Sequence, residues 1–173
     1  MSLSRQLLYA GLLLGALPGY VQAYDTLITA SGNIVGNGCT IAADSKNIHV
    51  PLGEIGMRNF TTSGSRVSPG KSFVINLEEC SSTFRGVRVR FIATPDQKNP
   101  QYIKVDEGGA SGVAIQLLDR NENPVALNTL TPAYELTEDD SVQIKFYARL
   151  VATEATVNAG AVSAVATWML EYQ

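Results

Sequence analysis

The residues that could carry catalysis in this sequence are few and widely spaced. His49 is the only histidine, so any serine or cysteine nucleophile would have to use it as its base. His49 stands in an ordinary strand-like pattern, and the sequence contains no G-x-S-x-G, H-E-x-x-H or P-loop motif. We therefore expect no catalytic residues, although a secreted enzyme stays open as a minor alternative.

Two other stretches could bind a ligand. The acids Glu138, Asp139 and Asp140 could hold a cation, and the glycine-rich residues 108–112 could surround a phosphate. However, the acids directly precede a strand pattern, as solvated turns do, and the glycine-rich run leads into a strand instead of a helix N-terminus. We interpret both stretches as loops and expect neither a metal nor a cofactor.

The start of the chain has the pattern of a secretory signal peptide, residues 1–23. A single charge, Arg5, precedes an apolar run over residues 7–17, and the small-residue pattern before Ala23 suits cleavage. A membrane anchor or a buried helix is the alternative. No other apolar run approaches the length of a membrane span, so we expect none in the mature chain.

Export would place Cys39 and Cys80 in an oxidising compartment. A lone pair of cysteines there most simply forms one disulfide. Two free thiols or a metal pair are the alternatives, and the metal pair is disfavoured because one histidine is too few to complete a site.

The charge balance argues against a nucleic-acid partner. The chain has 13 basic and 16 acidic residues and a net charge of −3. Arg88 and Arg90 cluster, but they alternate with apolar residues, as on the solvated face of a strand.

The elements that must position all these residues are strands. Apolar residues alternate with polar ones, glycine, proline, asparagine and aspartate separate the runs, and no segment of the mature chain has a helical period. We therefore predict a single all-β sandwich. The expected strands cover residues 39–42, 47–52, 71–80, 86–94, 101–105, 112–118, 125–127 and 141–152.

The C-terminal stretch, residues 160–173, is the most informative strand pattern. A strand that is apolar on one face and ends the chain leaves an edge on which another chain could pair. We predict that this edge is the functional part of the protein. Its face carries Val162, Ala164, Ala166, Trp168, Leu170 and Tyr172, between Gly160 and the terminal Gln173.

A second alternating stretch lies between the signal peptide and Cys39, over residues 24–38. Its pattern covers about 11 residues, or roughly 35 Å of extended chain. This stretch is either the first strand of the sandwich or a segment that leaves its own domain and joins another. One face carries Thr26, Ile28, Ala30, Gly32 and Ile34.

With both stretches in view, the chain resembles the pilin subunits of chaperone–usher fimbriae, especially the type 1 pilus group. The resemblance covers the whole mature chain. It rests on residues 28–34 with a glycine at Gly32, the two cysteines, residues 112–119 and 146–150, Gly160, and the penultimate Tyr172.

The resemblance implies an incomplete immunoglobulin-like β-sandwich that lacks its last strand. Residues 24–38 would be a donor-strand extension and residues 39–173 the pilin domain. A periplasmic chaperone would first pair with residues 162–172 and anchor the carboxylate of Gln173. At the outer-membrane usher, the extension of the next subunit would displace the chaperone, so that a head-to-tail fibre grows on the cell surface.

The place in the fibre is less defined by the sequence. One pilin domain is too small for a two-domain tip adhesin, and an adaptor is favoured over a shaft subunit because Ala30 stands where the family often has a larger aliphatic residue. A terminator at the base is a further alternative. Outside this family, a secreted lectin-like carbohydrate-binding module is the main competitor.

Overall fold

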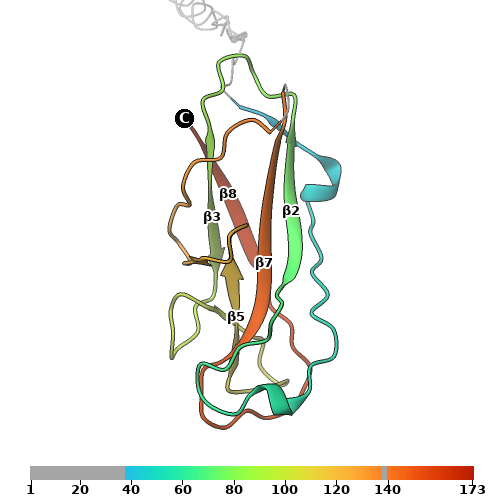
Figure 1. Ribbon diagram of the computed structural model, residues 1–173, viewed down its shortest axis with the longest axis vertical. Coiled ribbons are helices and arrows are strands. Elements are labelled where there is room, and N and C mark those ends of the chain that lie inside the picture. Colours follow the sequence, from blue (N-terminus) through green and yellow to red (C-terminus); the bar gives the residue numbers. More distant parts are fainter. Residues whose placement is uncertain (1–37, 138–139) are drawn as a thin grey trace, which may run out of the picture. The chain divides into compact units, whose positions relative to one another are not determined.

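The computed structural model describes residues 38–137 and 140–173, which belong to the second of two compact units, Val35–Gln173 (Figure 1). The predicted signal peptide and nearly all of the predicted extension lie outside the described residues. Within the described part, no helix is long and apolar enough to span a membrane.

The described chain folds into two antiparallel sheets. The larger has the order β1-β2-β7-β5-β4, with β6 also paired to β5, and the smaller contains only β3 and β8, which lie side by side (Figure 1). The strands are β1 Thr40–Ile41, β2 Lys71–Glu78, β3 Val87–Ala93, β4 Ile103–Lys104, β5 Val113–Leu118, β6 Pro124–Val125, β7 Val142–Ala152 and β8 Ala166–Tyr172; the single-turn 3₁₀ helices are η1 Ala43–Ser45 and η2 Met57–Asn59.

The core lies between the two sheets and is centred on Phe146 of β7. Its ring is fully buried, stacks on Phe73 with centroids 5.6 Å apart, and meets Phe91 edge-on at 5.0 Å. Such offset and edge-on pairs add to the stabilisation that burial itself gives. The alternating residues that defined the strands in the sequence therefore also fill the core, and the prediction of an all-β sandwich is confirmed.

Cys39 and Cys80 form the predicted disulfide. It joins the residue before β1 to the second residue after β2, and next to it the Ser81 amide donates a hydrogen bond to the Gly38 carbonyl at 3.1 Å. A cross-link over a sequence separation of 41 restricts the unfolded chain and contributes about 4 kcal/mol in the chain-entropy account.

Several predicted strands are shorter in the structure or absent. Residues 47–52 form no regular strand, and regular structure in the C-terminal stretch begins at Ala166, not near Val162. Alternation reports only that a segment is half-buried, whereas a strand also needs a neighbouring backbone. Residues 47–52 have no such neighbour among the described strands, and Pro51 has no N–H to donate.

Candidate functional site

The last strand, β8, has one paired edge and one free edge. It pairs with β3 along its whole length, from Val87 opposite Tyr172 to Ala93 opposite Ala166. No other described strand pairs with β8, because this sheet contains only two strands. Among the described residues, one edge of β8 therefore has no partner strand.

The inward side chains of β8 are less buried than those of its partner strand. Val87 and Val89 of β3 have no exposed surface, whereas their opposite residues, Tyr172 and Leu170, are only partly buried. The two strands face the same core, so the difference arises on the side of β8 that lacks a neighbour. The partly buried residues packed against the core from this stretch are Val162, Ala164, Ala166, Trp168, Leu170 and Tyr172.

A groove of about 920 Å³ lies beside the residues that precede β8 and the first part of that strand, as far as Trp168. One wall is formed by residues 46–55 and the other by residues 158–166 with Trp168. Its floor is apolar and comes from both sheets, including Phe73, Phe91, Ile115, Leu117 and Leu150.

The free edge presents hydrogen-bonding groups and apolar side chains from the same residues. The Gln173 amide donates to Gly86, at 2.9 Å, and the carbonyls of Ala161 and Ser163 accept from residues 110 and 106, both at 2.8 Å. Gly86 directly precedes β3, so Gln173 bonds on the β3 side, whereas residues 106 and 110 belong to the loop between β4 and β5. Because backbone groups alternate sides along a strand, those of the even-numbered residues of β8, from Ala166 to Tyr172, point to the free edge. This combination is what strand addition requires.

Close backbone packing holds the first part of this edge in place. A Cβ at Gly109 would collide with the carbonyl oxygen of Ala161, and one at Gly160 would lie 2.5 Å from the amide nitrogen of Ala110. The Ser163 hydroxyl also donates to the Asp106 carboxylate at 2.5 Å. The glycine-rich residues 108–112 therefore support the wall of the groove, and Gly160 permits the same close contact.

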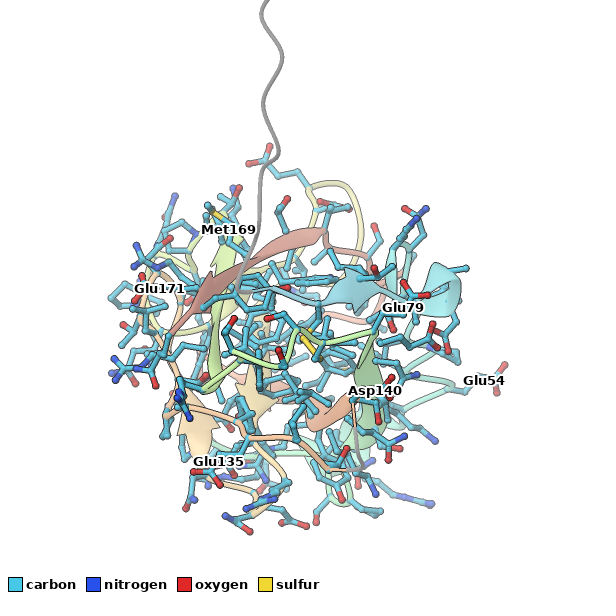
Figure 2. The ribbon with its side chains drawn as sticks, turned by 90° about the horizontal axis from the view of Figure 1, so that it is seen from above. Glu54, Glu79, Glu135, Asp140, Met169 and Glu171 are labelled. Atoms are coloured by element: carbon cyan, nitrogen blue, oxygen red, sulfur yellow. A yellow bond between two sulfur atoms is a disulfide. The ribbon has the colours of Figure 1, made fainter. Side chains whose placement is uncertain are left out.

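The other end of the edge is held by the C-terminal residue. With its amide oxygen facing Arg88, the Gln173 side chain accepts two hydrogen bonds from that guanidinium, at 2.9 and 2.8 Å. The outer side chains of β8, among them Met169 and Glu171, lie at the periphery of the molecule (Figure 2). Sequence reasoning missed the role of Arg88, because its alternation with apolar residues marks only a solvated strand face.

The structure gives no support to the other candidate sites. His49 is exposed on the wall of the groove, and the Asp140 carbonyl accepts a hydrogen bond from the Cys80 amide, beside the paired ends of β2 and β7. Glu138 and Asp139 lie outside the described residues. Within the described part of the chain, no three histidine, cysteine or acidic side chains gather as metal ligands would.

The wall formed by residues 46–55 was also missed as part of the site. The sequence predicted a strand over residues 47–52, whereas the structure has no regular strand there and the segment lines the groove. Pro51 was the available signal, because proline within a strand pattern indicates an edge.

Comparison with known proteins agrees with this geometry. Residues 28–173 match the family described as "Fimbrial protein". The chain belongs to the fimbrial protein family. This fimbrial chain is 39% identical over 172 residues to an uncharacterised fimbrial-like protein, YdeS, of Escherichia coli, covering 96% of this chain and 97% of the relative. It is 36% identical over 155 residues to the S-fimbrial protein subunit SfaG of the same species, covering 89% and 87%.

A solved structure of a chaperone–usher pilus, which concerns rod uncoiling, contains a chain with the same fold. The TM-score is 0.66 at 22% sequence identity, covering 88% of this chain and 98% of the pilus chain. The expected immunoglobulin-like sandwich and the resemblance to chaperone–usher pilins are thereby confirmed. The protein is a fimbrial subunit of a structural family whose members build extracellular pili.

Proposed function

We propose that this fimbrial subunit polymerises by donor-strand exchange, with the groove beside β8 taking the N-terminal extension of another subunit. The observation that carries the proposal is the free edge of β8, which has no partner strand among the described residues and whose residues Ala166 and Trp168 line an apolar groove. In this proposal residues 1–23 are the signal peptide, residues 24–38 the donor extension and residues 39–173 the pilin domain.

The donor face consists of the alternating residues predicted from the sequence, Thr26, Ile28, Ala30, Gly32 and Ile34. Every strand pair in the described structure is antiparallel, so the donor completes the sandwich in the same sense.

Gly38 packs against the Tyr172 ring, so the chain's own extension starts at the C-terminal end of β8. From there it could follow β8 only in parallel. An antiparallel donor must come from another subunit, and repetition of this contact gives an open head-to-tail fibre.

Before assembly the same edge needs a temporary partner, because an apolar edge left in water promotes aggregation. A periplasmic chaperone fills this role by pairing with residues 162–172 and anchoring the carboxylate of Gln173. Exchange for the donor strand then takes place at the outer-membrane usher, and the subunit reaches the cell surface in the fibre.

Within the fibre we place the protein as a minor adaptor subunit and not as the main shaft subunit. Ala30 supports this placement, because a short side chain at the centre of the donor face fills a groove poorly and weakens insertion into a neighbour. Quantitative mass spectrometry of purified fibres tests it. We expect far fewer copies of this chain than of a second subunit, and a fibre made almost wholly of this chain would contradict the placement.

A variant with residues 24–38 moved from the N-terminus to a position after Gln173, joined by a short Gly/Asn turn, tests donor-strand exchange. The turn forces the added strand to run antiparallel to β8. We expect a stable monomer, whereas the same domain with the segment deleted should aggregate or melt at a lower temperature. If both forms are monomeric and melt alike, the sandwich is already complete and the proposal fails. The measurements are size-exclusion chromatography and thermal unfolding.

A further inference from the structure

We infer that the Gln173 side chain engages Arg88 and thereby leaves the C-terminal carboxylate free for a cationic side chain of another protein. The inference rests on the proposed capture by a periplasmic chaperone and goes beyond it, because it assigns a task to two residues of this chain. Arg88 is the intramolecular competitor of the partner's cation, and the Gln173 amide removes that competition.

The pairing of β3 with β8 places Arg88 close to the end of the chain. Arg88 lies opposite Glu171, and the Gln173 amide donates to the Gly86 carbonyl at 2.9 Å, which fixes the backbone of the last residue. Side chains two residues apart share one face of a strand, so Arg88, Glu171 and Gln173 all lie on the outer face of this sheet. The Gln173 side chain reaches back along β8 to Arg88, whereas the terminal carboxylate continues past the end of the strand.

Arg88 directs two donors at one neutral acceptor. With the amide oxygen of Gln173 facing the guanidinium, Nε and Nη2 of Arg88 both donate to it, at 2.9 and 2.8 Å. A guanidinium that uses two donors normally binds a carboxylate. Two carboxylates stand nearby in the chain, that of Glu171 and that of the C-terminus, yet neither has an ion-pair partner within the described residues. The amide therefore holds the guanidinium that either carboxylate could otherwise bind.

This arrangement changes what the end of the chain offers to a partner. Residue 173 is exposed, so its carboxylate can be reached from solvent. If Arg88 were paired with that carboxylate, the pair would have to separate before a lysine or arginine of another protein could bind the same oxygens. Exposed ion pairs are weak, so the competition would reduce binding by about two- to fivefold.

Arg90 provides a matched control for Arg88. It stands two residues further along β3 on the same outer face, and it lies opposite Met169, which carries no charge. Met169 is four residues before the terminus, so Arg90 is further from the carboxylate than Arg88. Replacing Arg90 removes the same charge from the same face without removing the partner of Gln173.

An NMR titration of the C-terminal carboxyl group tests the inference on the chain itself. The mature chain is refolded with an excess of a synthetic peptide of residues 24–38, and the carbon-13 shift of the terminal carboxyl group is followed against pH. We expect Gln173→Ala to lower the pKa of this group by about 0.3–0.7, because the released guanidinium favours the charged form. In a chain that carries Arg88→Ala the same substitution should change nothing, whereas in a chain that carries Arg90→Ala the full effect should remain.

Three results of the titration would overturn the inference. The pKa of the terminal carboxyl group could stay unchanged in Gln173→Ala, or it could fall equally when Arg88 is absent. The third is a pKa that falls at Glu171, which is followed in the same spectra, and not at the terminus, because the released Arg88 would then pair with Glu171. A peptide that fails to bind contradicts donor-strand exchange instead, and the titration is then made on the mature chain alone.

Competition for a chaperone measures the consequence for capture. The wild-type chain and a variant are co-expressed with a limiting amount of the pilus chaperone that holds the wild-type chain in the periplasm, and mass spectrometry of the purified complex gives their ratio. Gln173→Ala should be captured about two- to fivefold less than the wild type, and the added Arg88→Ala should restore nearly equal capture. Equal capture of Gln173→Ala, or a loss that Arg88→Ala does not restore, would overturn the inference. If no pilus chaperone forms a complex with the wild-type chain, the proposed function fails, and the titration then decides the inference.

Discussion

The hydroxyl of Tyr172 donates a hydrogen bond to the backbone carbonyl of Cys39 at 3.2 Å, linking two residues 133 positions apart. The bond ties the end of β8 to the point where the N-terminal segment enters the domain. Cys39 also belongs to the Cys39–Cys80 disulfide, and the ring of Phe84 meets the Tyr172 ring edge-on at 6.2 Å. The free edge and the start of the extension are therefore fixed relative to each other.

Removing that hydroxyl should weaken the domain without opening it. We expect Tyr172→Phe to lower the free energy of unfolding by about 0.5–1.5 kcal/mol, the usual contribution of one hydrogen bond, because the ring keeps its packing against Gly38. Urea unfolding of the peptide-filled domain measures the change. Tyr147→Phe, where a hydroxyl is removed from the outer face of β7, is the matched control, and an equal loss there would show that the Cys39 contact contributes nothing.

Loss of the disulfide should have a larger effect. The double replacement Cys39→Ala and Cys80→Ala should cost about 4 kcal/mol, because the unfolded chain regains the freedom of the closed loop. Reduction of the wild-type chain should produce a comparable loss in chemical unfolding. If the double variant unfolds at the same urea concentration as the oxidised wild type, the cross-link has no stabilising role.

Gly109 should be intolerant of a side chain because a Cβ there collides with the Ala161 carbonyl. We expect Gly109→Ala to cost about 1–3 kcal/mol and to slow strand insertion, since it displaces the wall of the groove. Gly56→Ala is the control. Its nearest contact would lie 3.8 Å away, so we expect a change within about 0.5 kcal/mol. Similar stability and insertion rates for the two variants would contradict the supporting role of the glycine-rich loop.

Arg149 and Gln116 form a buried polar pair across β7 and β5. The Arg149 Nε donates to the Gln116 side-chain oxygen at 2.9 Å, and the arginine is only 8% exposed. Burial, and then the neighbouring charge of Arg66, lowers the pKa of Arg149 below its ordinary value. Its charged form is therefore held at some cost in free energy.

Removing one member of the Arg149–Gln116 pair should destabilise the domain more than replacing both members with apolar residues. Arg149→Met should destabilise the domain by about 1–3 kcal/mol, because it leaves the Gln116 amide without its partner. The double variant Arg149→Met with Gln116→Leu should recover most of that loss, since neither side then carries an unpaired buried group. Thermal unfolding of the four forms completes the cycle, and strictly additive losses would show that the two side chains do not act as a pair.

The sequence by itself determined the class of fold, the disulfide and the family. Period-two alternation is a local property of a half-buried strand, so β2, β3, β5 and β7 could be located within a few residues. The two cysteines had only each other as partners in an oxidising compartment. The short matches around Gly32, Gly160 and Tyr172 were each weak but identified the pilin family together.

Only the tertiary structure decided which backbone groups of the last strand are free. Alternation along residues 160–173 could not show that β3 takes one edge, that residues 106–110 hold residues 161–163, or that residues 46–55 form the opposite wall without pairing. These contacts join segments that are far apart in the chain. The residue pattern of one segment does not show which other segment packs against it. The candidate site is the unpaired edge of β8, so it can be identified only after the partners of every described strand are known.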